Sequence, residues 1–265
     1  MTSNSSSLPL VGLDPSLGAT VGIHLPGGEV MPVRHIIGVG RNYKAHADEQ
    51  GASVPDRPML FTKNPAAACL DGEAIRIPPV CTDKALTGAE SHGEREQVDF
   101  EGELAVVIGQ PCRDLRPDQV LDPAGPVLGV TCSNDVSARW WQKSGAGGQF
   151  CRGKSFDTFC PLGPVIVPLA ALGKPAGDLR LVTRLNGEVM QDDTTASMIF
   201  PLDELVAEIS RGTTLLPGTV ILTGTPSGVG MARSPQVFLQ DGDTVEIEIE
   251  GVGTLSNPVQ RAFAG

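Results

Sequence analysis

The chain has 265 residues, of which 40% are hydrophobic and 19% charged, a composition typical of a globular protein with a large buried core. The 20 Lys and Arg residues against 31 Asp and Glu give a net charge of −11, and only 4% of residues are aromatic. These values argue against a nucleic-acid partner, which requires a basic face and stacking rings. No apolar run approaches the roughly 18 residues of a membrane span, and no signal peptide is recognisable, so we expect a cytoplasmic protein without a membrane partner.

Glycine, proline and cysteine narrow the fold class further. The chain contains 32 Gly and 22 Pro, which predicts many turns and short strands rather than long helices. Its six cysteines form no C-x-x-C pair and show no zinc-finger spacing to a histidine. We therefore expect reduced, mostly buried thiols.

The first predicted elements are mainly strands. Residues 10–31 combine short apolar stretches with Gly and Pro, which indicates a small β-rich N-terminal region. Residues 35–40 predict a buried strand that leads into a loop at residues 41–43, and the polar residues 44–50 predict a short helix or a lid. Residues 81–97 are polar and aperiodic, so they are interpreted as a loop insertion.

The later elements are indicated by turn residues and periodicity. Residues 104–108 are rich in β-branched side chains and predict a strand. Asn186-Gly187 between alternating residues predicts a hairpin over residues 181–190. Apolar residues at i, i+3, i+4 and i+7 from Leu202 predict one amphipathic helix. Further strands are expected at residues 219–223 and 245–249.

Residues 148–155 match the phosphate-binding pattern G-x-x-x-x-G-K-[ST]. That site needs a strand before the glycine-rich loop and a helix after it, so that the helix N-terminus faces the phosphates. Residues 143–148 do not resemble a strand, and Pro161 and Pro164 leave no room for the helix. An NTPase is therefore rejected.

Three carboxylates, Asp99, Glu101 and Glu103, alternate along the chain directly before the strand predicted at residues 104–108. On a strand they share one face, and like charges raise each other's proton affinity unless a cation neutralises them. A solvated face is the alternative, but the apolar run that follows indicates burial. All-oxygen ligands suit Mg²⁺, Mn²⁺ or Ca²⁺ rather than zinc, and Asp135 is the candidate for a third ligand.

Six short motifs follow one another along the chain. They are IGVGRNY at 37–43 with His46 and Glu49, DFEGELAVVIG at 99–109, NDVSAR at 134–139 with Gln142, GKSFDTF at 153–159, NGE at 186–188 and TGTPSGVG at 223–230. Together and in this order they resemble the fumarylacetoacetate hydrolase (FAH) superfamily, in the short-chain acylpyruvase-like branch that includes the FAH domain-containing protein 2. The resemblance covers residues 35 to 260.

The resemblance implies a β-dominated α+β fold, namely the mixed β-sandwich roll of the fumarylacetoacetase C-terminal-like domain, assembled as a homodimer. It divides the chain into a small N-terminal β-rich region with the lid, residues 1–70, and a catalytic domain, residues 71–265. The insertion at residues 81–97 is longer than the family's usual link. Because of this departure, the resemblance constrains the fold and the metal more closely than it constrains the substrate.

The same resemblance assigns roles to residues. The positions that match metal ligands, for Mg²⁺ or Mn²⁺ with Ca²⁺ as a substitute, are Glu101, Glu103 and Asp135. The positions that match catalytic groups are His46 and Glu49, a dyad on the lid, and Lys154 beside the metal. The positions assigned to substrate binding are Arg41, Tyr43, Arg139, Gln142 and Thr225. A purely structural role stays open for Lys154, Arg139 and Thr225.

These roles suit the chemistry of 2-oxo acids. Such an acid can chelate Mg²⁺ through its carboxylate and 2-oxo oxygens, and the metal then acts as a Lewis acid. In hydrolysis of a 1,3-diketo acid, Glu49 would orient His46 to take a proton from water, and Lys154 would add positive charge near the developing oxyanion. We therefore expect a divalent-metal-dependent hydrolase that cleaves a C–C bond in an acylpyruvate or another 1,3-diketo acid.

Two other functions stay open. Oxaloacetate tautomerisation or decarboxylation, or another isomerase or lyase reaction on a 2-oxo acid, would use the same site. A catalytically silent binding protein is the remaining class.

Overall fold

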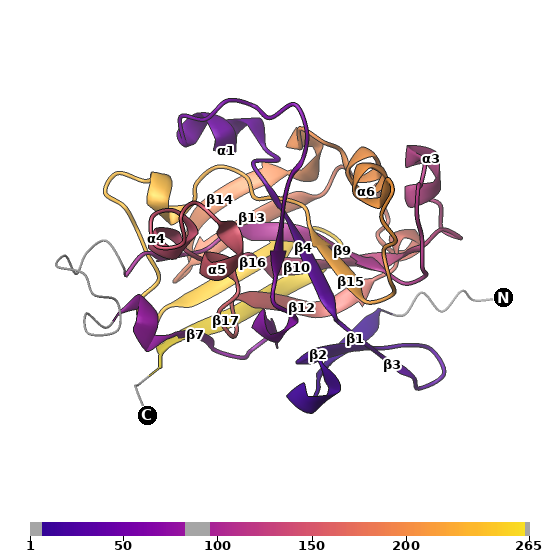
Figure 1. Cartoon of the computed structure of the whole chain (residues 1–265), viewed down its shortest axis with the longest axis horizontal. Helices are drawn as coiled ribbons and strands as arrows, with labels where there is room; N and C mark the ends of the chain where they lie inside the picture. Colours follow the sequence, from indigo (N-terminus) through magenta and orange to yellow (C-terminus); the bar gives the residue numbers. More distant parts are fainter. Residues whose placement is uncertain (1–6, 83–95, 263–265) are drawn as a thin grey trace.

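The computed structural model describes residues 7–82 and 96–262, which fold mainly into strands (Figure 1). The large mixed sheet has ten strands: β1 (Leu8–Gly12), β2 (Val21–His24), β3 (Val30–Pro32), β4 (His35–Gly40), β5 (Met59–Lys63), β6 (Ala68–Leu70), β9 (Gly102–Ile108), β10 (Val127–Asn134), β12 (Cys160–Val167) and β15 (Thr219–Leu222). Their order is β3-β2-β1-β12-β10-β9-β15-β4-β5, and β6 pairs with the first residues of β12.

A second sheet packs against the first. Its strands are β7 (Ile75–Ile77), β13 (Arg180–Leu185), β14 (Glu188–Thr194), β16 (Thr244–Ile249) and β17 (Gly253–Arg261). Their order is β14-β13-β16-β17-β7. Strands β9, β10 and β12 of the large sheet contact β13, β16 and β17 of the second sheet. Two short strands, β8 (Val98–Asp99) and β11 (Ser137–Ala138), pair separately.

The helices are short, as the Gly and Pro content predicts. They are α1 (Lys44–Glu49), α3 (Pro117–Val120), α4 (Arg139–Gln142), α5 (Phe150–Lys154) and α6 (Leu202–Ser210). One-turn 3-10 helices lie at Pro15–Leu17, Pro65–Ala67, Pro79–Cys81, Leu169–Ala171, Thr195–Ser197 and Gly230–Ala232. Within the described ranges, no helix has the length and apolar character needed to cross a membrane.

Strand β9 lies at the centre of the molecule because both of its faces are buried. Leu104, Val106 and Ile108 point into the large core between the two sheets, whereas Ala105 and Val107 belong to a smaller cluster on the opposite face. A strand covered on both faces requires a continuous apolar run. The prediction that this run is buried is confirmed, and it places the preceding carboxylates in the interior.

Strands of the N-terminal region are hydrogen-bonded into the large sheet. Strand β1 pairs with β12, and β4 runs parallel to β15. The division of the chain near residue 70 stays a prediction. The insertion predicted at residues 81–97 lies almost entirely outside the described residues. The six cysteines are free, and four of them are buried, as predicted.

One local prediction is wrong. Asp99, Glu101 and Glu103 do not lie on one strand, because β8 ends at Asp99 and β9 begins at Gly102. Between the two strands, side-chain oxygens replace the carbonyl oxygens of a neighbouring strand as hydrogen-bond acceptors. Glu101 N donates to Asn134 Oδ1 at 3.0 Å, and Gly102 N donates to Gln191 Oε1 at 3.0 Å. Asp99 accepts the backbone N–H groups of Gly230 and Met231 and does not belong to the group formed by Glu101, Glu103 and Asp135.

The predicted hairpin and helix are confirmed, by β13–β14 and by α6. In the hairpin turn Asn186 and Gly187 have φ values of 52° and 83°, the left-handed pair that a type I′ turn requires.

Gly187→Ala is expected to destabilise the protein by about 1–2 kcal/mol, because alanine pays a steric penalty in the left-handed region. Gly177→Ala is the matched control, since Gly177 is exposed, has no positive φ and has open space where a Cβ would stand. Urea unfolding of the two variants measures the difference. Equal free energies of unfolding would contradict the assigned turn.

Candidate active site

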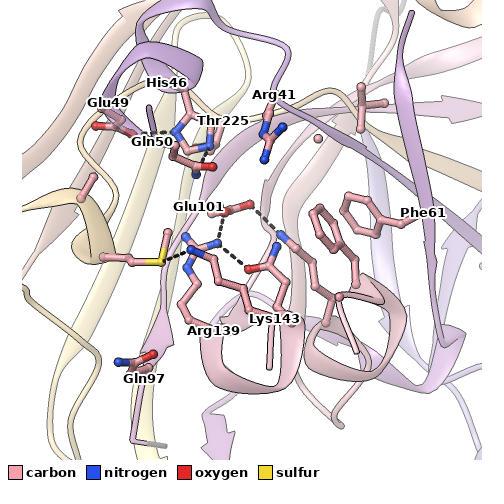
Figure 2. Close-up of a pocket in the computed structure, with 18 of the residues that line it drawn as sticks. Arg41, His46, Glu49, Gln50, Phe61, Gln97, Glu101, Arg139, Lys143 and Thr225 are labelled. Atoms are coloured by element: carbon pink, nitrogen blue, oxygen red, sulfur yellow. Dashed lines mark hydrogen bonds and ion pairs between the residues drawn. The ribbon is translucent and has the colours of Figure 1, made fainter. Parts of the chain in front are cut away.

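The large cavity, with a volume of about 740 Å³, opens where several loops and short helices meet beside β9 (Figure 2). Its lining comes from the end of β4, from α1, from α4 and α5, and from the loop after β15. In Figure 1, α1 lies above the sheets at the top of the view. Most of the site residues predicted from the sequence lie in or under this cavity.

Three buried carboxylates lie close together at the site, and one of them, Glu101, lines the cavity. Glu101, Glu103 and Asp135 each offer one oxygen, and these oxygens lie within 4.8 Å of one another. Adjacent antiparallel strands bring them together, since Ser133 of β10 stands opposite Glu103 of β9 and Asp135 follows shortly after. The backbone N–H of Asp135 also donates to the Glu101 carbonyl oxygen at 2.8 Å. The predicted grouping of these three residues is therefore present.

Two of the three carboxylates are neutralised by buried cations. Lys154 Nζ lies 2.7 Å from Glu101 Oε2 and 2.5 Å from Asp135 Oδ2. Lys63 Nζ contacts Asp135 Oδ1 and donates to the Phe159 carbonyl oxygen at 2.6 Å. Burial alone would raise the pKa of Glu101, but Lys154 and Arg139 outweigh it and hold that pKa well below its usual range.

Glu103 is different, because no ion pair is found for it among the described residues. It is 1% exposed, and it accepts the backbone N–H of Gly224 at 2.8 Å. Burial, reinforced by Asp135 and Glu101, raises its pKa well above the ordinary value. A divalent cation with oxygen ligands would supply the missing positive charge. The triad therefore fits Mg²⁺ or Mn²⁺, as the sequence predicts.

The predicted dyad lies on α1 beside the same cavity. His46 Nδ1 lies 2.6 Å from Glu49 Oε1, and Glu49 Oε2 accepts the backbone N–H of Gly228 at 2.8 Å. Gly228 has a φ of 103°, and a Cβ there would lie 2.2 Å from the Met190 carbonyl oxygen, so only glycine fits. The loop after β15 thus fixes Glu49, and Glu49 fixes His46.

The contacts of His46 define which ring nitrogen can accept a proton. A carboxylate only accepts hydrogen bonds, so Nδ1 carries the hydrogen that points to Glu49. The amide nitrogen of Gln50 lies 2.9 Å from His46 Nε2 and only donates. Nε2 is therefore the unprotonated ring nitrogen, and its electron pair accepts the hydrogen bond from Gln50. That bond has to be released before Nε2 can act as a general base. A helix is present where a helix or a lid was predicted, while movement of a lid stays a prediction.

Arg139 contacts Glu101 of the triad, and Gln142 contacts Arg139. Arg139 pairs with Asp99 at 2.7 Å and with Glu101 Oε1 at 2.6 Å, and it donates to Gln142 Oε1 at 3.1 Å. Both residues line the cavity, but the guanidinium is already occupied by two protein carboxylates. Their predicted contact with substrate stays a prediction, and the structural role left open for Arg139 is present.

Thr225 and Tyr43 occupy different positions. Thr225 lines the cavity, and its hydroxyl donates to the Gly102 carbonyl oxygen at 2.9 Å and accepts from Gln191 Nε2 at 2.8 Å. Tyr43 is fully buried in the large core and does not line the cavity. Burial first, and then Glu103, raise the pKa of its phenol. Direct binding of substrate by Tyr43 stays a prediction that this position does not favour.

The rejected phosphate-binding pattern is accounted for. Residues 150–154 form α5, so the lysine closes a short helix instead of opening a long one. Its ammonium group faces Glu101 and Asp135, which leaves it no role in cradling phosphate.

Several site residues carry no recognisable signal in the sequence. Lys63 ends the short strand β5, and Gln191 lies in β14. The unpredicted residues that line the cavity include Gln50, Phe61, Gln97, Lys143 and Phe150. Each is an isolated side chain that only the tertiary fold brings to the site.

The structure thus combines a β-dominated fold with a buried acidic triad and a His–Glu dyad. The chain belongs to the fumarylacetoacetate hydrolase family: the model named "Fumarylacetoacetate (FAA) hydrolase C-terminal" matches residues 35–260. This confirms the family and the fold that the motifs predicted.

Two curated relatives show to which members of the family the chain is similar. "Oxaloacetate tautomerase FAHD2A, mitochondrial" of Bos taurus is 42% identical over 224 residues, which cover 84% of this chain and 66% of that protein. "Oxaloacetate tautomerase YisK" of Bacillus subtilis is 41% identical over 231 residues, covering 86% of this chain and 70% of that protein. The chain thus spans about two thirds of the length of these relatives. The identity to the FAHD2A protein supports the predicted domain-2-like branch.

Among solved structures, the fumarylpyruvate hydrolase of Pseudomonas aeruginosa in complex with Mn²⁺ and pyruvate has a TM-score of 0.72 and 27% sequence identity. The alignment covers 88% of this chain and 92% of that one. The named relatives are enzymes, and one of them was crystallised with a divalent metal.

Proposed function

We propose that this protein is a divalent-metal-dependent tautomerase that interconverts the keto and enol forms of oxaloacetate. The observation that carries the proposal is that Glu101, a member of the acidic triad, lines the same cavity as the His46–Glu49 dyad (Figure 2), with Glu103 and Asp135 buried beside it. The first gives a place for a metal, and the second gives a base. The names of relatives that are 42% and 41% identical support this substrate. The function expected first from the sequence, C–C hydrolysis, becomes the second candidate.

Glu101, Glu103 and Asp135 would hold the metal, for which we propose Mg²⁺ or Mn²⁺. When bound, such an ion polarises the 2-oxo group of a substrate and so makes the neighbouring C–H bond more acidic. The chain's own groups then move the proton. His46 Nε2 accepts it from the carbon next to the 2-oxo group, and Glu49 stabilises the positive charge on the ring.

Returning this proton to the 2-oxo oxygen gives the enol, so the reaction loses and gains no atoms. Lys154, buried on Glu101 and Asp135, contributes fixed positive charge beside the developing negative oxygen. The burial of His46, at 3% exposed, limits exchange of its proton with bulk water.

Hydrolysis of an acylpyruvate stays the second candidate. It is favoured by the fold shared with the fumarylpyruvate hydrolase and by the aromatic wall of Phe61 and Phe150, whose ring centroids lie 5.6 Å apart. Such a wall could pack against an acyl tail. In that reaction His46 would take its proton from a water molecule instead of from carbon.

A product-resolved assay separates these candidates. The protein is given enol-oxaloacetate or acetylpyruvate, with Mg²⁺ or with a chelator, and loss of the enol absorbance is followed together with pyruvate, acetate and CO₂. The proposal predicts metal-dependent loss of the oxaloacetate enol without pyruvate. Pyruvate plus acetate from acetylpyruvate would establish a hydrolase, and pyruvate plus CO₂ from oxaloacetate a decarboxylase. If neither compound reacted, the proposed function would be wrong.

The assembly and cellular location expected from the sequence stay predictions. We propose the homodimer and the cytoplasm for this chain. Of the two relatives named above, the one from Bos taurus is described as mitochondrial.

A further inference from the structure

The cations beside the acidic triad have little positive charge left for a second carboxylate of a substrate. Arg139 is paired with Asp99 and Glu101, and Lys154 is paired with Glu101 and Asp135. Each of these cations already has two protein carboxylates within ion-pair distance. A ligand with a second carboxylate, remote from the metal, needs other partners.

Two further cations line the cavity without such a pairing. Arg41 and Lys143 are both part of the lining, and no salt bridge is found for either one within residues 7–82 and 96–262. Their side-chain contacts are to methionine sulfur: Arg41 Nη1 lies 3.9 Å from Met59 Sδ, and Lys143 Nζ lies 3.2 Å from Met231 Sδ. A thioether is a weak acceptor, so both charges remain available.

The surroundings indicate local excess of positive charge. Burial, followed by Arg139 and Arg41, lowers the pKa of Lys143. The chain as a whole has more carboxylates than cationic side chains, with a net charge of −11. Even so, no salt bridge to Arg41 or Lys143 is found within the described residues. Arg41 is also held in the left-handed region at a φ of 56°, a strained conformation of the kind found at ligand sites. In Figure 2 the side chains of Arg41 and Lys143 enter the cavity from opposite sides.

We propose that Arg41 and Lys143 form an anion subsite that binds the second carboxylate of a dicarboxylic 2-oxo acid. The subsite rests on the proposed function, because the triad and dyad act on the 2-oxo end of the same molecule. It makes the enzyme select dicarboxylic substrates over acylpyruvates with an uncharged tail. The contribution is moderate, since Arg41 is half-buried and Lys143 is exposed at the cavity mouth.

The test compares two substrates that differ only in the remote charge, oxaloacetate and its 4-methyl ester. In Arg41→Gln and Lys143→Gln, the ratio of kcat/KM for oxaloacetate to that for the ester is expected to fall about tenfold in each variant, mainly through a higher KM for oxaloacetate. Arg41→Lys and Lys143→Arg keep the charge and are expected to restore most of the ratio. Lys44→Gln is the control, since Lys44 is exposed and lies outside the lining.

Binding calorimetry on the metal-loaded protein separates failure of the subsite from failure of the proposed function. If the wild type turned over neither compound, the tautomerase proposal would fail, and tighter binding of oxaloacetate than of the ester, lost in both glutamine variants, would still support the subsite. Unchanged ratios and unchanged relative affinities in Arg41→Gln and Lys143→Gln would overturn it. A loss of the same size in Lys44→Gln would also overturn it, because it would reflect net charge alone.

Discussion

Replacing His46 with asparagine is expected to lower kcat about 10²–10⁴-fold, which is the usual contribution of a positioned general base. Asparagine can still donate a hydrogen bond toward Glu49 from the side of the ring that carries Nδ1, but it offers no basic nitrogen to the substrate. Because the hydrogen bonds of His46 found among the described residues go to Glu49 and Gln50 and not to the acidic triad, the Mg²⁺-induced rise in Tm should persist. Steady-state kinetics and thermal melts with and without Mg²⁺ give both values.

Glu49→Gln provides the companion variant, since it keeps the shape of the dyad and removes its charge. We expect a smaller loss than in His46→Asn, because the amide oxygen of glutamine can still accept the Nδ1 hydrogen of His46. Its NH2 group, however, cannot accept the N–H of Gly228, and the neutral amide no longer stabilises the protonated ring. Retention of most wild-type activity in His46→Asn would contradict the assignment of His46 as the base.

Glu103→Gln is expected to abolish the Mg²⁺-dependent rise in Tm and to lower activity by about 10²-fold or more. At a metal concentration of about 100 Kd, the lost stabilisation would be roughly 2.7 kcal/mol. Without metal the variant should be at least as stable as wild type. The substitution removes a buried carboxyl group whose charged form is disfavoured by burial and by Asp135 and Glu101, and it leaves an amide oxygen to accept the N–H of Gly224.

Differential scanning calorimetry over a Mg²⁺ series measures this effect. Glu188→Gln is the matched control, because Glu188 is an exposed carboxylate in β14 and is not a member of the acidic triad. It should respond to Mg²⁺ as wild type does. An undiminished metal-induced shift in Glu103→Gln would remove Glu103 from the ligand set.

Local signals in the sequence were sufficient for much of the fold. Asn186-Gly187 predicted the β13–β14 turn, and the spacing from Leu202 predicted α6. The apolar run of β9 predicted a buried strand. The break between Asp99 and Gly102 was not predictable, because it depends on Asn134 and Gln191. Those side chains approach from strands 33 and 89 residues away in the chain.

The candidate site divides in a similar way. Motifs in a fixed order pointed to the triad, to the dyad and to Lys154, and the structure brings these groups together. Lys63 was missed because a single lysine after an apolar strand normally reaches solvent, and its contact with Asp135 spans 72 residues of chain. Gln50 and Lys143 were missed for the same reason. The order of the strands decides which of these isolated side chains meet, and no local sequence pattern encodes that order.

The central claim is that the triad and the dyad act as one catalytic unit, and a double-mutant cycle tests it most directly. The measurement is kcat/KM for loss of the oxaloacetate enol, at saturating Mg²⁺, in wild type, His46→Asn, Glu103→Gln and the double variant. Removal of a proton from carbon by His46 is effective only while the neighbouring 2-oxo oxygen is polarised by the metal. The account therefore predicts that kcat/KM of the double variant is no lower than that of the poorer single variant. Losses that multiply would show that the two groups act independently and would contradict the account.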